Sequence, residues 1–307
     1  MYSRVLWSKG IVVLFCFMVS VTGFYHVADA YGKGPVVGLL STRHSTYEGE
    51  YNTARNIEAL LLKFGAEKVV LIDYNEIVEA LQGSNKPIFI ERSLLKILSK
   101  NEIDRIFIPG NYYNIVSQPL PPVPNRQLVT DAVVKIMGEK SSKKDLKLLA
   151  ICGGLQGVLH AQKVEIRKLK DMLGSRKSAE VHISSMPDPR SKNAPLSRIE
   201  AIEGSKLGAM ISKARGDGGM FCYLPDAHRE AVYASAENIA KLRRLGYKVS
   251  AVSSDGMIEG LEDSRGNMLL QMHPEYLLMG MDEKTGKNDE VDISIRVAEQ
   301  VIRDFLS

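Results

Sequence analysis

The chain has 307 residues, of which 45% are hydrophobic and 25% are charged, with a formal net charge of +4 at pH 7. This composition is typical of a globular protein and allows one large domain or two small ones. The small net charge, without a basic run interleaved with aromatic residues, gives nucleic-acid binding little support. The densest basic run, at residues 140–147, is interpreted as a solvated loop before a strand.

The first thirty residues have the pattern of a secretory signal peptide. Arg4 and Lys9 precede an apolar run at residues 11–23, and the sequence ADA follows at residues 28–30. Crossing a bilayer takes about 20 apolar residues, so the short run favours a cleaved signal over a retained anchor. We therefore expect residues 31–307 to form a single exported domain, bacterial and periplasmic, with no stable membrane insertion once the signal is cleaved.

The first half of the remaining chain alternates apolar strands with amphipathic helices. In chain order, the predicted elements are strand 35–42, helix 53–66, strand 68–73, helix 93–103, strand 104–110, a proline-rich loop at 119–126, helix 127–140, strand 146–151, and a helix after Cys152. This alternation is typical of a parallel sheet with both faces covered by helices. In such sheets functional groups gather at the carboxyl ends of the strands, where Cys152 and Gly110 both lie.

The second half is less regular. The predicted elements are a loop at 182–198, short and partly antiparallel strands at 198–204, 208–211, 220–224 and 248–254, a helix at 236–246, an apolar strand at 267–276 that enters a His-Pro-Glu turn, and a closing amphipathic helix at 292–306 capped by Asp292. We find no internal repeat and no linker between domains. The predicted fold class is α/β, a three-layer sandwich with a mostly parallel central sheet.

Cys152 is a candidate nucleophile. It lies in the sequence Ala-Ile-Cys-Gly-Gly, and these small residues allow the tight strand-to-helix turn of a nucleophile elbow. The N-terminus of the next helix favours the thiolate, and the Gly153 amide is placed to donate to an oxyanion. A buried structural cysteine at a strand end fits this motif equally well. The other cysteine of the exported region, Cys222, has apolar neighbours and is interpreted as structural.

A thiol nucleophile also needs a base and a group that orients the base. His273 ends an apolar strand, and Glu275 lies two residues on, across Pro274. Residues two apart in an extended segment point to the same side, so the Glu275 carboxylate could hold the imidazole. Taken alone, this pair is also compatible with an ordinary loop histidine beside an acid.

The remaining histidines of the exported region carry less signal. His44, His160 and His182 have no partner pattern and are interpreted as packing or surface residues. The sequence has no CxxC motif, no HExxH motif and no clustered His/Asp set, so it predicts no metal site.

The cysteine motif CGGLQ at 152–156 and the downstream QMHPEY at 271–276 together resemble the class I glutamine amidotransferase family. The closer resemblance is to its γ-glutamyl-γ-aminobutyrate hydrolase branch, the peptidase C26 group, through stretches such as VVGLLST, IFIPGNYYN and KVSAVSSDGMIEGLE. The resemblance covers nearly all of residues 35–307, in the order of the family. It implies a flavodoxin-like fold and a reaction that needs no metal or organic cofactor.

The resemblance also implies three groups of site residues. The catalytic triad consists of the nucleophile Cys152, the base and acid His273, and the orienting carboxylate Glu275. The oxyanion amides come from Gly110, Asn111 and Gly153, and the contacts to the γ-glutamyl group from Gln156 and His228.

The chain departs from the family pattern in three places. The family commonly has Gly-Gly or Gly-Ser after the proline of the oxyanion strand, whereas this chain has Gly110 and Asn111. The substrate loop commonly reads Ser-x-His-His-Gln, whereas residues 226–230 read DAHRE and introduce charges at Arg229 and Glu230. The signal peptide is the third departure, because the putrescine catabolism of this branch is cytoplasmic.

The function predicted from the sequence is therefore thiol-dependent hydrolysis of a γ-glutamyl amide through a glutamyl thioester. An exported member would act on a small γ-glutamyl compound of the envelope, with no nucleic-acid partner, and a homo-oligomer is left open. One alternative is an exported, non-catalytic binding protein on the same fold, which the altered substrate loop favours. The other is the glutaminase subunit of an amidotransferase, which the signal peptide disfavours because ATP-using partners are not expected outside the cytoplasm.

Overall fold

The computed structural model describes residues 33–45, 47–81, 87–117, 124–139, 146–174, 182, 196–279 and 289–307. The predicted signal peptide lies outside these residues, as does most of the loops predicted at 119–126, 140–147 and 182–198. Among the described helices, none combines the length and the apolar character needed to span a bilayer. Pro35–Ser307 forms one compact unit.

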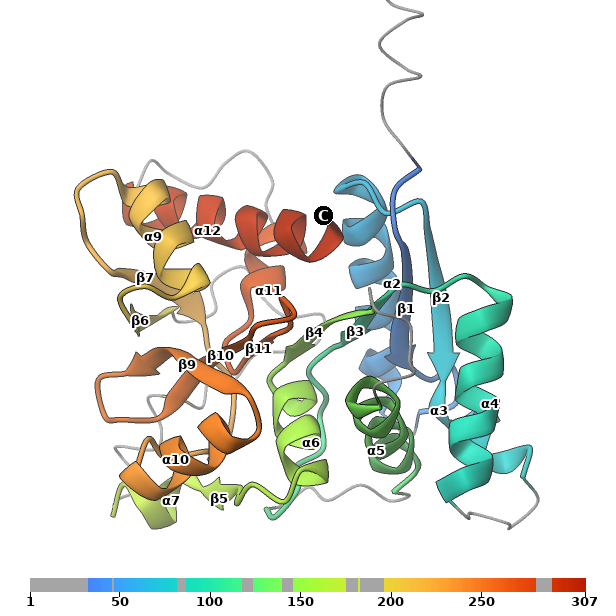
Figure 1. Ribbon diagram of the computed structural model, residues 1–307. Helices are drawn as coiled ribbons and strands as arrows, with labels where there is room; N and C mark the ends of the chain where they lie inside the picture. Colours follow the sequence, from blue (N-terminus) through green and yellow to red (C-terminus); the bar gives the residue numbers. More distant parts are fainter. Residues whose placement is uncertain are drawn as a thin grey trace, which may run out of the picture. The chain divides into compact units, whose positions relative to one another are not determined.

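A nine-stranded sheet runs through this unit in the order β2-β1-β3-β4-β11-β10-β9-β6-β7 (Figure 1). The strands are β1 (Val36–Ser41), β2 (Lys68–Asp73), β3 (Arg105–Ile108), β4 (Lys147–Ile151), β6 (Leu196–Ala201), β7 (Phe221–Pro225), β9 (Tyr247–Ser253), β10 (Ile258–Asp263) and β11 (Met268–Leu270). Neighbours from β2 to β11 pair in parallel, and neighbours from β11 to β7 pair antiparallel. A separate two-stranded sheet joins β5 (Arg167–Lys168) to β8 (Glu230–Ala231).

Helices cover both faces of the large sheet (Figure 1). One face carries α2 (Glu48–Lys63), α9 (Lys206–Arg215), α11 (Pro274–Met279) and α12 (Asp289–Leu306). The other carries α3 (Tyr74–Glu79), α4 (Pro87–Lys100), α5 (Asn125–Gly138), α6 (Gly153–Ala161) and α10 (Ala236–Arg244), and the short α7 (Leu169–Met172) follows β5.

The side chains of the central strands alternate between two hydrophobic cores. In β4, Leu149 and Ile151 belong to the core under α2 and α12, whereas Leu148 and Ala150 belong to the core under α4, α5 and α6. Successive side chains of a strand point to opposite faces, so a strand buried on both faces is apolar throughout. The predicted three-layer α/β fold is confirmed.

Three local predictions were wrong. Residues 208–211, predicted as a strand, lie in α9, where the Ser205 side chain caps the helix by accepting from the Gly208 amide. The strand predicted at 267–276 stops at Leu270, because Pro274 starts a helix, a position that suits proline. The last helix begins at Asp289 and not after an Asp292 cap.

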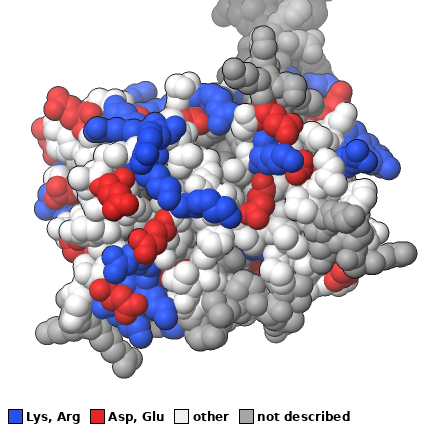
Figure 2. Space-filling view, turned by 60° about the horizontal axis from the view of Figure 1, so that its bottom comes forward, with Lys and Arg blue, Asp and Glu red and all other residues white. Residues whose placement is uncertain are grey.

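The face shown in Figure 2 carries a run of adjoining basic side chains from its upper left toward its middle, with acidic side chains beside the run.

Candidate active site

Cys152 sits at the carboxyl end of β4 and at the N-cap of α6 with φ 50° and ψ −109°. It is one of three non-glycine residues with positive φ in the described part of the chain. Its amide donates to the Leu270 carbonyl of β11 at 2.7 Å, and its carbonyl accepts from the Gln156 amide at 3.0 Å. A backbone in such a sparsely populated region costs about 1–3 kcal/mol, and strain of this kind is common at functional sites. The predicted elbow geometry is present.

Gly154 lets the elbow pack closely on the neighbouring strand. A Cβ atom at this position would lie 2.2 Å from the carbonyl oxygen of Ile108 in β3. No side chain fits at that distance, so α6 can leave the elbow along this path only with glycine there. The second glycine of the CGG motif therefore serves helix–strand packing.

His273 and Glu275 form a buried pair after β11. The imidazole Nδ1 and a Glu275 carboxylate oxygen are 2.7 Å apart, and both side chains are fully buried. Glu275 lies in the first turn of α11 and not in an extended segment, yet it still reaches the ring. The Tyr276 ring stacks on the imidazole with centroids 4.3 Å apart. A carboxylate that accepts from Nδ1–H leaves Nε2 as the nitrogen available to a thiol.

The thiol and the imidazole meet at Gly110. β4 and β11 are parallel neighbours, with Ile151 opposite Leu270, so the residues that follow them lie close together. A Cβ atom on Gly110 would stand 3.4 Å from Cβ of Cys152, 3.5 Å from Nε2 of His273 and 2.6 Å from Cε1 of the same ring. The structure thus brings Gly110, Cys152 and His273 together.

The oxyanion candidates are also adjacent. A Cβ atom on Gly153 would lie 3.2 Å from the backbone nitrogen of Asn111 and 2.2 Å from its side-chain amide group. The start of α6 therefore abuts the turn that follows β3. Two backbone amides, those of Asn111 and Gly153, belong to this junction beside the thiol.

Arg126 is a residue of this region that the sequence did not single out. From α5, it donates to the Pro109 carbonyl, and its Nε lies 3.0 Å from the Asn111 side-chain amide. Its guanidinium also lies 3.5 Å from the buried Glu50 carboxylate. Arg126 thereby holds the turn that carries the oxyanion candidates. The sequence placed it at the end of a proline-rich loop, where nothing local indicates a buried arginine.

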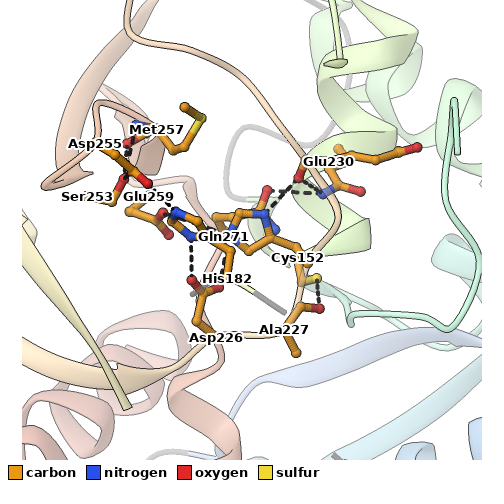
Figure 3. A network of polar contacts seen from close by, with 12 residues as sticks. Cys152, His182, Asp226, Ala227, Glu230, Ser253, Asp255, Met257, Glu259 and Gln271 are labelled. Atoms are coloured by element: carbon orange, nitrogen blue, oxygen red, sulfur yellow. Dashed lines mark hydrogen bonds and ion pairs between the residues drawn. The ribbon is translucent and has the colours of Figure 1, made fainter. Parts of the chain in front are cut away.

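Gln156 and His228, the predicted substrate contacts, are buried and bonded to the chain itself. Gln156 Nε2 donates to the Glu230 carbonyl at 2.7 Å and to the Gln271 side chain at 3.1 Å, while His228 Nδ1 donates to the same Glu230 carbonyl at 2.8 Å. Within the same loop, the Ala227 carbonyl lies 3.9 Å from the Cys152 sulfur (Figure 3). The proposed contact of Gln156 and His228 with substrate stays a prediction.

The two charged residues of the substrate loop, Arg229 and Glu230, differ in burial. Arg229 is exposed, whereas the Glu230 carboxylate is fully buried. Glu230 accepts from the amides of Ile115 and Val116, both at 2.7 Å, and from the amide and hydroxyl of Ser117. It therefore anchors the segment that follows the oxyanion turn.

A pocket borders the oxyanion turn. Its lining includes Gly110 and Asn111 together with Tyr47, Tyr112, Tyr276, Ser41 and Glu50. The Tyr47 and Tyr112 rings stack with centroids 4.2 Å apart. Glu50 accepts from the Tyr74 hydroxyl at 2.8 Å, and burial together with this carboxylate raises the pKa of Tyr74. The pocket is thus aromatic with one buried acid.

Four buried acidic and histidine side chains gather at the loop of residues 226–230, and two of them belong to the loop itself. They are His182, Asp226, His228 and Glu259, and the structure makes them the described group that could hold a metal ion. Burial opposes charge on His182, but its contacts with Asp226 and Asp255 outweigh burial and raise its pKa to about 9. Burial and the two aspartates raise the pKa of Glu259 well above its usual range. The sequence analysis predicted no metal site and treated His182 as a packing or surface residue.

No protein-family model matches this sequence, and no curated protein matches it. Among solved structures, a glutamine amidotransferase from Methylobacillus flagellatus is similar, with a TM-score of 0.42 and 13% sequence identity. The match covers 89% of this chain and 94% of that chain. A likeness at this level does not identify an activity.

Proposed function

We propose that the chain is a thiol-dependent hydrolase of γ-glutamyl amide bonds with Cys152, His273 and Glu275 as its triad. The observation that carries this proposal is the meeting of a strained elbow cysteine with an imidazole whose far nitrogen is held by a buried carboxylate at 2.7 Å. A purely structural cysteine has no need of positive φ, a buried base or an orienting acid. The γ-glutamyl part of the proposal rests on the sequence resemblance.

In the first half of the reaction, the Cys152 sulfur attacks the side-chain carbonyl of the γ-glutamyl group, and the thiol proton is held by His273 Nε2. The carbonyl electron pair moves onto oxygen, where amides at Asn111 and Gly153 stabilise the oxyanion. Each such donor is typically worth roughly 3 kcal/mol in the transition state. Glu275 stabilises the imidazolium that forms.

In the second half, collapse of the tetrahedral intermediate breaks the C–N bond, and His273 gives its proton to the leaving amine. A glutamyl thioester on Cys152 remains. Water then attacks the thioester with His273 as the base, glutamate leaves, and the thiol is restored.

A non-catalytic binding protein is the second candidate, and one observation favours it. Cys152 is only 5% exposed and His273 is fully buried, so substrate has little direct access to the sulfur. Under this alternative the same fold would bind a γ-glutamyl compound without cleaving it. We also infer from the first thirty residues that the protein is exported, whichever of the two functions it has.

Glutamate release from a panel of γ-glutamyl amides and peptides, measured under reducing conditions, tests the proposal. Release by the wild type and by Cys222→Ala, with none from Cys152→Ala, supports the thiol hydrolase, since Cys222 is a buried cysteine outside the proposed triad. No release from any compound, together with failure of Cys152 to react with a thiol-directed glutamine analogue, supports the binding protein. Release that persists in Cys152→Ala contradicts the assignment of the nucleophile.

A further inference from the structure

The group of His182, Asp226, His228 and Glu259 includes two residues of the loop that passes the thiol, Asp226 and His228. Figure 3 shows His182, Asp226 and Glu259 to one side of Cys152. Each of the four side chains is at most 3% exposed, and one ligand atom from each lies within 4.8 Å of the others. We propose that these residues bind one divalent transition-metal ion of the zinc type. None of the proposed triad residues, Cys152, His273 and Glu275, belongs to this set, so the proposed metal site is separate from the triad.

The spacing of the ligand atoms fits tetrahedral coordination. Bonds of about 2.1 Å from a tetrahedral zinc ion put neighbouring ligand atoms about 3.4 Å apart. Asp226 oxygens lie 2.8 Å from His182 Nδ1 and 3.0 Å from His228 Nε2. A Glu259 oxygen lies 4.0 Å and 3.9 Å from the same two nitrogens. These four separations bracket the tetrahedral value, so small side-chain shifts would complete the site.

Several atoms of the group lack a hydrogen-bond partner within the described residues. They are His228 Nε2, Asp226 Oδ1 and both carboxylate oxygens of Glu259. His228 Nε2 and Asp226 Oδ1 are close, but their alignment is not that of a hydrogen bond. Buried polar atoms are nearly always paired, and a buried carboxylate without any partner is unusual. A cation held between these atoms would satisfy all of them.

The other ring nitrogen of each histidine is fixed by an oxygen acceptor. His182 Nε2 lies 2.8 Å from the Asp255 carboxylate, and His228 Nδ1 lies 2.8 Å from the Glu230 carbonyl. If each of these nitrogens carries the proton, the lone pairs of His182 Nδ1 and His228 Nε2 face the group. Metal-binding histidines almost always show this arrangement, which sets the tautomer and the direction of the ring.

The charges and the types of donor atom indicate which metal ion the site would select. Two carboxylates and two neutral imidazoles balance a charge of +2, and mixed nitrogen and oxygen donors suit zinc and its neighbours better than calcium or magnesium. Four protein ligands at such low exposure make a closed site, which is typical of a structural ion. Such an ion would fix the Asp226–His228 stretch, and with it the Ala227 carbonyl that lies 3.9 Å from the sulfur.

The test uses the purified protein, treated with a chelator and then titrated with cobalt(II) and zinc(II). We expect one zinc per chain by elemental mass spectrometry, visible absorption of tetrahedral cobalt(II), and a higher Tm with either ion. Asp255→Asn, which changes the acceptor that faces His182 Nε2, should weaken binding by about 10–100-fold. Glu259→Gln removes a ligand oxygen and should weaken it further.

Two variants serve as controls. His160→Ala changes an exposed histidine, and Cys152→Ala removes the proposed nucleophile, so both should bind cobalt(II) like the wild type. Retained binding in Cys152→Ala also separates this site from the hydrolase proposal, since either can fail without the other. A wild type that takes up no stoichiometric ion and shows no tetrahedral band overturns the proposal. Unchanged affinity in both Asp255→Asn and Glu259→Gln, with circular dichroism showing both folded, also overturns it.

Discussion

Replacing Gly110 with alanine tests whether the thiol and the imidazole meet where the structure places them. The new Cβ atom would lie 2.6 Å from Cε1 of His273, whereas ordinary carbon–carbon contact needs about 3.6 Å. One of the two groups must therefore move by about 1 Å. The imidazole has little freedom, because Glu275 holds its Nδ1 and Tyr276 stacks on its face.

A misplacement of about 1 Å at a catalytic group can cost about 100-fold in rate. We therefore expect Gly110→Ala to lower kcat for γ-glutamyl amide hydrolysis by about that factor, with the protein still folded. Gly110 is not among the residues with positive φ, so backbone strain does not complicate the change. Steady-state glutamate release gives kcat, and the rate of Cys152 alkylation reports the state of the thiol independently.

Gly138→Ala is the matched control. A Cβ atom there meets no other atom within 4 Å, and the residue ends a helix, where alanine is preferred over glycine by up to about 1 kcal/mol. This variant should keep the wild-type kcat and an equal or higher Tm. Wild-type kcat and alkylation rate in Gly110→Ala would refute the placement of His273 against Gly110 and Cys152.

Three other changes probe the buried acids and the second cysteine. Glu275→Gln keeps the shape of the side chain but not its charge, and should lower kcat by about 10⁴-fold with little change in KM, as steady-state kinetics can show. Glu230→Gln should lower the free energy of unfolding by about 3 kcal/mol, because it weakens the charge-assisted hydrogen bonds that Glu230 accepts from backbone amides and from Ser117. Urea titrations measure this change. A loss below about 0.5 kcal/mol would contradict the anchoring role of Glu230. Burial raises the pKa of the Cys222 thiol from 9.0 to about 12, so the folded protein keeps a proton that the unfolded chain loses. Stability should therefore fall as the pH rises through this interval, by about 1.4 kcal/mol per pH unit relative to Cys222→Ala. Equal pH slopes for the two proteins would show that this thiol is not buried as described.

The parallel half of the fold was predictable from the sequence because its signals are local. Strands such as β1 and β4 are apolar apart from one terminal residue each, since both faces are covered, and the intervening helices show a clear helical period. The elbow at Cys152 could be predicted because a cysteine between a strand and a helix, with small residues on both sides, has the local pattern of a nucleophile elbow.

The prediction about Glu275 reached the right contact through the wrong local structure. The sequence suggested an extended segment across Pro274, and the structure has the first turn of a helix there. Proline suits both conformations, so the residues alone did not decide between them. The carboxylate reaches His273 in either case, which is why the pairing was found and the element was not.

The His182 group was not predictable, because its members come from separate parts of the chain. His182 is followed by Asp226 after 44 residues and by Asp255 after 73 residues, without any ligand spacing that a motif search would recognise. The buried position of Arg126 was not predicted for a related reason, since its partners Pro109 and Glu50 lie in other parts of the chain. Contacts of this kind depend on how the layers pack, and no local pattern reports them.

The short strand β11 has a consequence for the order in which the protein becomes competent. Met268–Leu270 is the seam of the sheet, parallel to β4 on one side and antiparallel to β10 on the other, and it leads directly to His273. Strand β11 can pair with β4 only after more than a hundred residues beyond Cys152 have been synthesised. Pairing between strands so far apart in the sequence is intrinsically slow. A chain that has formed only its first four strands holds a cysteine without a base, so the maturation of the thiol is coupled to the completion of the whole sheet.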